Sequence, residues 1–295
     1  MLYNNNVMVG TIIKSIGGLY TVKSFDSIIE CKARGVFRKD NISPVVGDTV
    51  EISNDVISKI LPRKNFIVRP PLANLDTMVF VISTTKPSPN VTMLDKFIAV
   101  CEYKNINPVI ALTKIDLADY NNILTIYNTI GIKTFTIDYS NKQSYMDLKE
   151  YLANKISAFT GNSGAGKSTL LNAIDTSLNI PTGDISQKLG RGRHTTRHSE
   201  LYQLDNGGLI ADTPGFSTFE TNKYDIIKKE NLASCFREFS PYVNNCRFND
   251  CSHTKEKGCA VIQAVKDGII PKSRHSSYCE MFENAKLLKD WEINN

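Results

Sequence analysis

The sequence predicts a multidomain protein with a small N-terminal β-barrel, a central α/β domain and a C-terminal, mainly helical, metal-binding domain. Short strand-like runs separated by glycine and asparagine fill residues 1–64, and residues 65–221 alternate between buried-strand and helix patterns. Three cysteines and a histidine lie close together within residues 222–295. A chain of 295 residues has room for such a division, because single domains usually have about 100–200 residues.

Composition excludes some classes of protein. Hydrophobic residues make up 41% of the chain, which is enough for buried cores, yet no run reaches the roughly 18 consecutive apolar residues of a membrane span. The start, MLYNNNVMVGTIIKS, lacks the basic region and apolar core of a secretion signal. We therefore expect a cytoplasmic protein with no membrane partner.

The net charge of +5 is concentrated at the two ends of the chain. Residues 1–64 have nine Lys and Arg against six Asp and Glu, which gives +3, and residues 222–295 have twelve against ten, which gives +2. Basic flanks around a neutral centre suit a polyanionic partner, because Lys and Arg displace counterions from phosphates. A solvated surface without a special function is an equally simple reading of this pattern.

Four short strands are predicted in the N-terminal domain, at residues 7–16, 18–25, 27–37 and 49–53. This spacing is typical of a small barrel, of which the oligonucleotide-binding (OB) fold is a common form. The following stretch, residues 62–76, is predicted as a linker, because prolines at 62, 70 and 71 interrupt any regular element.

A basic cluster at the end of the third predicted strand adjoins Phe37. Its members are Lys32, Arg34, Arg38 and Lys39. The cluster either grips a phosphate backbone while Phe37 stacks on a base, or it is a solvated strand end beside a core phenylalanine.

The central domain alternates predicted strands and helices, which favours a doubly wound α/β fold. A nearly continuous apolar run, expected of a buried parallel strand, occupies residues 77–84, and further strands are predicted at residues 108–114, 131–137 and 157–160. Helical faces between them are formed by Met93, Leu94, Phe97, Ile98 and Cys101, by Ile123, Ile126, Tyr127 and Ile130, and by Leu148, Leu152 and Ile156. A last pair of short strands is expected at residues 202–204 and 208–211.

The stretch GNSGAGKS, residues 161–168, fits the phosphate-binding loop pattern G-x-x-x-x-G-K-[ST] and lies between a short strand and a helix-forming run. Its glycines let successive backbone N–H groups point at the β-phosphate, at the positive end of the following helix. Lys167 is expected to reach the β- and γ-phosphates, and the Ser168 hydroxyl to ligate Mg²⁺. The predicted nucleotide-binding residues here are Gly161, Asn162, Ser163, Gly164, Ala165, Gly166, Lys167, Ser168 and Thr169.

The run TKID, formed by Thr113, Lys114, Ile115 and Asp116, ends a predicted strand and fits the guanine-reading pattern [NT]-K-x-D. The Asp116 carboxylate can accept hydrogen bonds from the N1–H and the N2 amino group of guanine, a pair of donors that adenine lacks. A buried polar group left unpaired costs about 1–3 kcal/mol, so the motif favours GTP over ATP. Lys114 is expected to lie along the purine ring.

The run DTPG, residues 212–215, fits the D-x-x-G pattern after an apolar strand. Asp212 is expected to hold Mg²⁺ through water, and the Gly215 N–H to sense the γ-phosphate. The polar, glycine-bearing stretch 190–198, GRGRHTTRH, is predicted as a loop in which Thr195 or Thr196 completes the Mg²⁺ shell.

Phe216 follows DTPG where Ras-like enzymes have a glutamine that orients the attacking water. Intrinsic hydrolysis is therefore expected to be slow, with a partner or another side chain supplying the missing group. His194 is either that water-orienting group or a solvent-exposed loop histidine.

The order of these motifs is unusual, because TKID precedes the phosphate loop by about 45 residues instead of following it. A circularly permuted chain gives this order without changing the site in space, since domain termini often lie close enough to be joined. The DTPG run then leads directly into the C-terminal segment, so its nucleotide-dependent movement is expected to be transmitted there.

Four soft ligands form the pattern C-x4-C-x-H-x5-C, with Cys246, Cys251, His253 and Cys259. Three thiolates and one imidazole close a tetrahedral shell, which predicts one structural Zn²⁺ with no open catalytic position. The metal is expected to fold a segment that is poor in apolar residues. His275 and Cys279 are alternative fourth ligands, but we expect them to be ordinary surface residues.

The basic barrel, the permuted order TKID, GNSGAGKS, GRHTT and DTPGF, and the cysteine-histidine pattern together resemble the bacterial small-ribosomal-subunit-dependent GTPase A (RsgA) family. The resemblance covers essentially the whole chain. It implies a monomeric GTP hydrolase, converting GTP to GDP and phosphate with Mg²⁺, that acts late in maturation of the 30S ribosomal subunit.

The resemblance further implies that the barrel and the zinc domain contact 16S rRNA, that the subunit stimulates a slow hydrolysis, and that hydrolysis releases the protein. It implies the water-positioning role for His194. The run TIDYS, residues 136–140, departs from the family, which usually has a serine–alanine pair there to support the guanine. Two alternatives remain: a nucleotide-gated RNA-binding module, and a permuted GTPase of large-subunit assembly.

Overall fold

The computed structural model describes residues 7–25, 27–35, 37, 42–180, 200–212 and 226–288. By contacts the chain divides into two compact units. The first unit comprises Met1–Met78, Tyr145–Gly161 and Lys167–Phe219, and the second comprises Val79–Ser144, Asn162–Gly166 and Glu220–Asn295. The domain boundaries expected after residues 64 and 221 stay a prediction, and the second of them lies outside the described residues.

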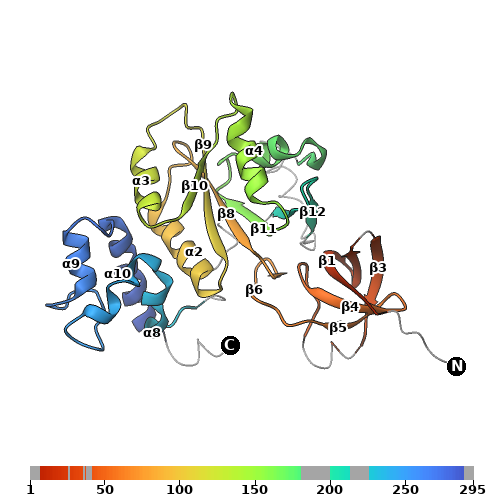
Figure 1. Cartoon of the computed structure of the whole chain (residues 1–295), viewed down its shortest axis with the longest axis horizontal. Coiled ribbons are helices and arrows are strands. Elements are labelled where there is room, and N and C mark those ends of the chain that lie inside the picture. The colour runs from red at the N-terminus through yellow and green to blue at the C-terminus, as the bar shows by residue number, and fades with distance from the viewer. Residues whose placement is uncertain are drawn as a thin grey trace. The chain divides into compact units, whose positions relative to one another are not determined.

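A closed five-stranded barrel forms the N-terminal part of the first unit (Figure 1). Along each strand the side chains alternate between the two faces, and those that point into the barrel, such as Ile12, Val22 and Ile57 on three different strands, are fully buried. The barrel prediction is confirmed, although the sequence pattern did not reveal the fifth strand. The strands β1 (Met8–Ile16), β2 (Leu19–Ser24), β3 (Ser27–Ala33), β4 (Thr49–Ser53) and β5 (Val56–Ile60) are joined in the order β1-β2-β3-β5-β4.

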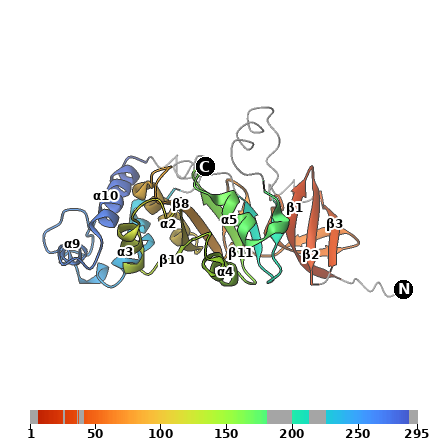
Figure 2. The ribbon, with the colours of Figure 1, turned by 90° about the horizontal axis from the view of Figure 1, so that it is seen from above.

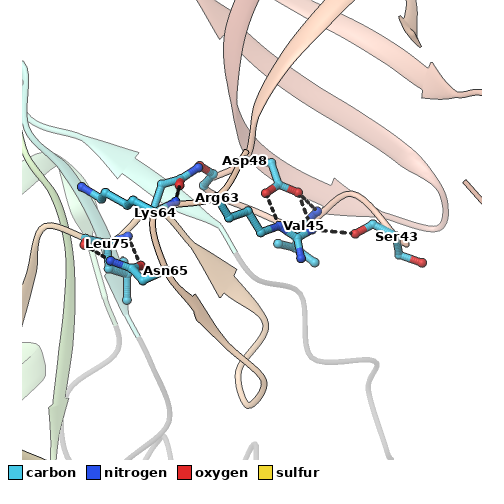
Figure 3. Close-up of polar contacts among 9 residues, drawn as sticks. Ser43, Val45, Asp48, Arg63, Lys64, Asn65 and Leu75 are labelled. Carbon is cyan, nitrogen blue, oxygen red and sulfur yellow. Dashed lines mark hydrogen bonds and ion pairs between the residues drawn. The ribbon is translucent and has the colours of Figure 1, made fainter. Parts of the chain in front are cut away.

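The stretch after the barrel is ordered by polar contacts (Figure 3). Arg63 donates to both carboxylate oxygens of the buried Asp48, at 2.6 and 2.8 Å, and to the Ser43 carbonyl at 2.9 Å. The Asn65 side chain exchanges two hydrogen bonds with the backbone of Leu75, at 2.8 and 2.9 Å. The expectation of a linker without any regular element was wrong.

Two very short antiparallel strands lie within this stretch, β6 (Phe66–Ile67) and β7 (Leu72–Ala73). The three prolines stop longer pairing, but the side chains of Arg63 and Asn65 tie the stretch to the barrel and to its own far end.

The rest of the first unit contains the strand that leads into the phosphate loop. The strand β11 (Ile156–Gly161) pairs in parallel with β13 (Leu209–Asp212), so that Phe159 lies opposite Asp212. The short strand β12 (Leu201–Gln203) runs antiparallel to β13. Glu200, just before β12, forms an isolated antiparallel bridge with Lys14 of β1, and their side chains form an ion pair at 2.8 Å.

Among the described residues, six strands make up the central sheet, in the order β10-β9-β8-β11-β13-β12. All seven residues of β8 are buried, as its continuous apolar run predicts. The α/β prediction is confirmed. The remaining strands and helices of this domain are β8 (Thr77–Ser83), α2 (Val91–Tyr103), β9 (Asn107–Thr113), α3 (Asn121–Thr129), β10 (Lys133–Thr136), α4 (Lys142–Tyr151), α5 (Lys167–Ile174) and the 3-10 turn η1 (Thr176–Leu178).

The C-terminal segment is mainly helical, as expected, and packs against α2 within the second unit (Figure 2). The rings of Phe236, Phe239 and Tyr278 contact one another. They belong to a buried hydrophobic cluster that also contains Ala99 and Val100 of α2. No helix in the described part of the chain has the length and apolar character to cross a membrane. The elements are α8 (Lys229–Leu232), η3 (Ala233–Cys235), η4 (Arg237–Phe239), η5 (Val243–Asn245), α9 (Ala260–Lys266) and α10 (Lys272–Lys286).

Candidate functional site

The phosphate loop has the backbone that its glycines predict. Gly164 and Gly166 have φ angles of +80° and +92°, which L side chains rarely adopt. The Ala165 N–H donates to the Asn162 carbonyl at 2.9 Å, closing the turn before α5 begins at Lys167. A loop of this shape in front of a helix N-terminus can hold the phosphates of a nucleotide.

The guanine-reading run is attached to the phosphate loop by two side chains. The buried Thr113 hydroxyl donates to the Ala165 carbonyl at 2.6 Å, and the Lys114 ammonium donates to the Gly164 carbonyl at 2.8 Å. Lys114 has a left-handed φ of +57°. The structure thus brings together two motifs that are about 45 residues apart in the chain. Asp116, two residues after Lys114, is exposed.

The stretch after β8 contributes residues that the sequence pattern did not reveal. The Thr84 hydroxyl donates to the Lys114 carbonyl at 2.6 Å, and the Thr84 N–H donates to the Thr113 carbonyl at 3.1 Å. The Lys86 carbonyl accepts from the Lys114 ammonium. The available signal was a polar run, TTKP, directly after a fully buried strand, since ligands bind at the carboxyl ends of strands in open α/β sheets.

Two further predicted residues meet in the first unit. The Lys167 ammonium forms an ion pair with the Asp212 carboxylate at the end of β13. Both groups are partly buried, so the interaction is stronger than a solvated surface pair. A carboxylate beside the phosphate-loop lysine is suited to hold Mg²⁺ through water, with Ser168 as the hydroxyl ligand.

Several predicted residues lie outside the described residues. They are His194, Thr195, Thr196, Gly215 and Phe216, together with Arg38 and Lys39 of the basic cluster. Of the remaining cluster, Lys32 and Arg34 are exposed and Phe37 is half-buried. In the TIDYS run, Ser140 donates through its backbone N–H and its hydroxyl to Asp138, at 2.9 and 2.7 Å, so its side chain is already engaged.

The cysteines and histidine of the C-terminal pattern form a compact cluster whose ligand atoms lie within 4.8 Å of one another. The Sγ atoms of Cys246 and Cys259 are 3.8 Å apart, and each lies 3.5 Å from Nδ1 of His253. A tetrahedral Zn²⁺ with bonds of about 2.3 Å to sulfur and 2.0–2.1 Å to nitrogen separates its ligand atoms by roughly 3.8 Å (S to S) and 3.5 Å (S to N). The cluster therefore fits zinc.

Backbone and side-chain contacts fix the loop between these ligands. Backbone N–H groups of Ala260 and Ile262 donate to the Sγ atoms of Cys246 and Cys259, at 3.4 and 3.5 Å. The Glu256 carboxylate accepts from the N–H groups of Ser252, Thr254 and Lys255, at 3.0–3.1 Å, and from the Ser252 hydroxyl. Burial alone would raise the pKa of Glu256, but these hydrogen bonds lower it to about 2.

His275 and Cys279 are not ordinary surface residues, contrary to expectation. Both are partly buried on α10, and Nε2 of His275 donates to the His253 carbonyl at 2.7 Å. They are not members of the metal cluster. His275 instead supports the backbone of a metal ligand, as residues around zinc sites commonly do.

We expect the uptake of Zn²⁺ at neutral pH to release at least two protons. Burial raises the pKa of the Cys251 thiol to about 12 and also raises that of Cys259, so both thiols are protonated before metal binds. Burial lowers the pKa of His253, so the imidazole is already neutral. Because zinc binds the thiolates, its affinity should rise with pH.

Calorimetric titration of the metal-free protein in two buffers with different ionisation enthalpies measures the released protons. The variant Cys251→Ala is the control and should release about one proton fewer. A heat that does not depend on the buffer would contradict the prediction.

Comparison with known protein families agrees with this geometry. The family model described as "RsgA GTPase" matches residues 60–222, and that described as "RsgA N-terminal domain" matches residues 9–58. The chain is 45% identical to the small ribosomal subunit biogenesis GTPase RsgA of Caldanaerobacter subterraneus subsp. tengcongensis, covering 94% of this chain and 95% of that protein. It is 43% identical to the protein of the same name from Clostridium perfringens, over 94% and 97% of the two chains.

Solved structures agree as well. YjeQ from Thermotoga maritima superposes with a TM-score of 0.81 at 32% identity, covering 96% of this chain and all of that one. YloQ, described as a circularly permuted GTPase, superposes with a TM-score of 0.78 at 34% identity, over 97% and 98% of the two chains. With a phosphate loop, a guanine-reading run in permuted order and whole-chain relatives, this chain belongs to the RsgA family of small ribosomal subunit biogenesis GTPases and is a GTP hydrolase.

Proposed function

We propose that this GTPase acts late in the maturation of the 30S ribosomal subunit, that it contacts 16S rRNA through its barrel and its C-terminal segment, and that the subunit stimulates hydrolysis and so releases the protein. The observation that carries the proposal is the whole-chain similarity to small ribosomal subunit biogenesis GTPases, combined with a phosphate loop and a guanine-reading run in permuted order.

In the proposed site, the N–H groups of residues 161–168 hold the phosphates, and Lys167 compensates their charge. Thr113, Lys114 and Asp116 hold the guanine. Ser168 and Asp212 hold Mg²⁺, directly and through water, and that ion stabilises charge developing on the phosphates. Thr195 or Thr196, the Gly215 N–H and His194 are proposed to complete the site when GTP is bound.

The exposed lysine and arginine at the end of β3 support an RNA-facing barrel. Lys32 and Arg34 are accessible to phosphates, and their contribution to binding should weaken as salt rises, because counterion release drives it. The cluster of three cysteines and a histidine is proposed to hold one structural zinc ion, since the separations of its ligand atoms match a tetrahedral shell.

Turnover of GTP with and without purified 30S subunits tests the proposal. Partner groups raise GTPase rates by about 10³–10⁵, so we expect stimulation well above about tenfold. Purified 50S subunits serve as the control particle and should stimulate little. Unchanged turnover with 30S subunits would favour the alternative of a nucleotide-gated RNA-binding module.

Co-sedimentation with 30S and with 50S subunits distinguishes the proposal from the remaining alternative, a GTPase of large-subunit assembly. Binding to 30S and not to 50S is expected, and it should weaken in the double variant Lys32→Glu, Arg34→Glu. Lys59→Glu is the matched control, because Lys59 is also an exposed basic residue of the barrel but already pairs with Glu51 at 3.6 Å. Preferential binding to 50S would favour a GTPase of large-subunit assembly.

A further inference from the structure

Arg274 lies on α10, yet its side chain is completely buried against α2. Its guanidinium donates to Asp95 of α2 at 2.8 Å and to both carboxylate oxygens of Glu238 at 2.7 and 3.3 Å. Asp95 is also fully buried, and Glu238 is nearly so. Buried carboxylates depend on such a partner, because an unpaired charge in the interior is strongly unfavourable. Arg274 thus fixes α10 to α2.

The same cluster includes the next helix of the GTPase domain. The Tyr127 hydroxyl of α3 donates to Asp95 at 2.9 Å, and the Arg274 guanidinium stacks on Phe236 at 4.5 Å from the ring centre. The second carboxylate oxygen of Asp95 is buried without a hydrogen-bond partner among the described residues. Without Arg274, the Tyr127 hydroxyl is the hydrogen-bond donor that remains to Asp95 among the described contacts, and it supplies no compensating charge.

The turns of α10 next to Arg274 hold the metal loop. His275 donates to the His253 carbonyl at 2.7 Å, and the Tyr278 hydroxyl donates to the Ser252 carbonyl at 2.8 Å. His253 has a left-handed φ of +57°, so its backbone needs such support. The position of α10 is consequently tied to the geometry of the metal cluster.

The other end of the connection reaches the guanine-reading run. The N-cap of α2 is Asn90, whose side chain accepts from the Met93 N–H at 2.9 Å. Just before it lie Thr84 and Lys86, which hold Lys114 through the Thr84 hydroxyl and the Lys86 carbonyl. Contacts within the second unit therefore connect the metal loop, through α10 and Arg274, to α2, and the short chain segment between Lys86 and Asn90 joins α2 to the residues that hold Lys114.

We infer that Arg274 is a positioning residue that links occupancy of the metal site to the affinity for guanine nucleotide. The inference rests on the proposed zinc and guanine sites. Metal binding fixes the loop, the loop fixes α10, and Arg274 then holds α2 and the Thr84–Lys86 stretch in the arrangement that receives the base. The entropic cost of ordering on nucleotide binding is smaller when this arrangement is already formed.

The coupling is measured as the dissociation constant of fluorescently labelled GDP for the full chain, with zinc bound and after chelation. Allosteric couplings usually correspond to about 5- to 150-fold, and we expect a loss at the low end of that range, about 5- to 20-fold, on chelation. Linkage requires the reciprocal effect for the same metal, so the factor by which Co²⁺ loading tightens GDP binding should equal the factor by which GDP raises the affinity for Co²⁺, followed by its absorption.

Arg274→Lys keeps the charge but loses the forked contact with two carboxylates, and it should bring the ratio of the two dissociation constants close to one. Tyr278→Phe is a milder variant that keeps the aromatic packing and removes only the hydrogen bond to Ser252. It should lower the ratio as well. Lys96→Gln is the matched control, because Lys96 pairs with Glu280 at 2.7 Å between the same two helices but at the surface; its ratio should equal that of the unaltered chain.

Equal GDP affinity of the zinc-bound and chelated protein would overturn the inference, whatever the folding state of the C-terminal segment. If both Arg274→Lys and Tyr278→Phe kept the same ratio of GDP dissociation constants, chelated to zinc-bound, as the unaltered chain, the role of Arg274 would be overturned. Failure of the zinc-bound chain to bind GDP, or failure to take up metal, would refute the proposed sites themselves, whereas independent binding of both ligands refutes only the coupling.

Discussion

Replacing Lys167 by alanine is expected to lower kcat/KM for GTP by about 10²–10³, the range seen when one preorganised charged or hydrogen-bonding group is removed from a transition state. The ammonium is the positive charge of the phosphate loop, and in the structure it faces the Asp212 carboxylate. Without it, the carboxylate remains beside the phosphates and adds repulsion. Lys167→Arg should recover part of the loss, because it restores the charge with a different shape.

Lys149→Ala is the matched control for this change. Lys149 is a buried lysine of the same unit, and it forms an ion pair with Asp205 at 2.8 Å, away from the phosphate loop in the chain. Its variant should keep full activity while losing some stability. Equal losses of activity in the two variants, measured in steady-state assays alongside thermal unfolding, would show that Lys167 acts only through the fold.

Asp116→Asn is expected to move the preference of the enzyme from GTP toward xanthosine triphosphate. The asparagine amide offers a donor where xanthine has a carbonyl, and it leaves the N2 amino group of guanine without its acceptor. Sites that read a base or side chain by hydrogen bonds discriminate by up to about 10⁴–10⁵, and we expect at least about a 100-fold loss of GTP affinity. Competition of GTP and xanthosine triphosphate for labelled GDP measures the shift.

Asp119→Asn controls for the loss of a carboxylate in the same loop. Asp119 is exposed and accepts from the backbone and side chain of Asn121, at 3.0 and 2.8 Å, so it has a local structural role. Its variant should keep the preference for GTP. Unchanged GTP affinity in Asp116→Asn would refute the assignment of the guanine-reading run.

The sequence alone predicted those parts of the site whose chemistry is local. The phosphate loop needs glycines with positive φ and a helix directly after it, and both requirements are visible within eight residues. The candidate metal ligands lie within 14 residues of one another, and three cysteines and a histidine at this spacing seldom serve a purpose besides metal binding. Buried strands such as β8 are equally visible, because a short, continuous apolar run between turn signals is typical of a strand covered on both faces.

Contacts between distant segments were not predictable in the same way. Arg274 and Asp95 are 179 residues apart, and nothing in either neighbourhood shows that a charged residue is buried there. Thr84 and His275 act on backbone carbonyls, so no complementary side chain marks their partners. The stretch 62–76 was expected to lack regular structure because of its prolines, whereas tertiary hydrogen bonds from Arg63 and Asn65 order it.

The bridge between Lys14 and Glu200 has a consequence for solubility. Among the described strands, β12 is the last of the six-stranded sheet, and an uncovered last strand offers unpaired N–H and C=O groups to any other chain. Here β1 of the barrel meets the start of that strand and places an ion pair across it. The barrel thereby contacts one end of this edge strand, and the ion pair places charges where another chain would have to pair, which is expected to discourage aggregation there.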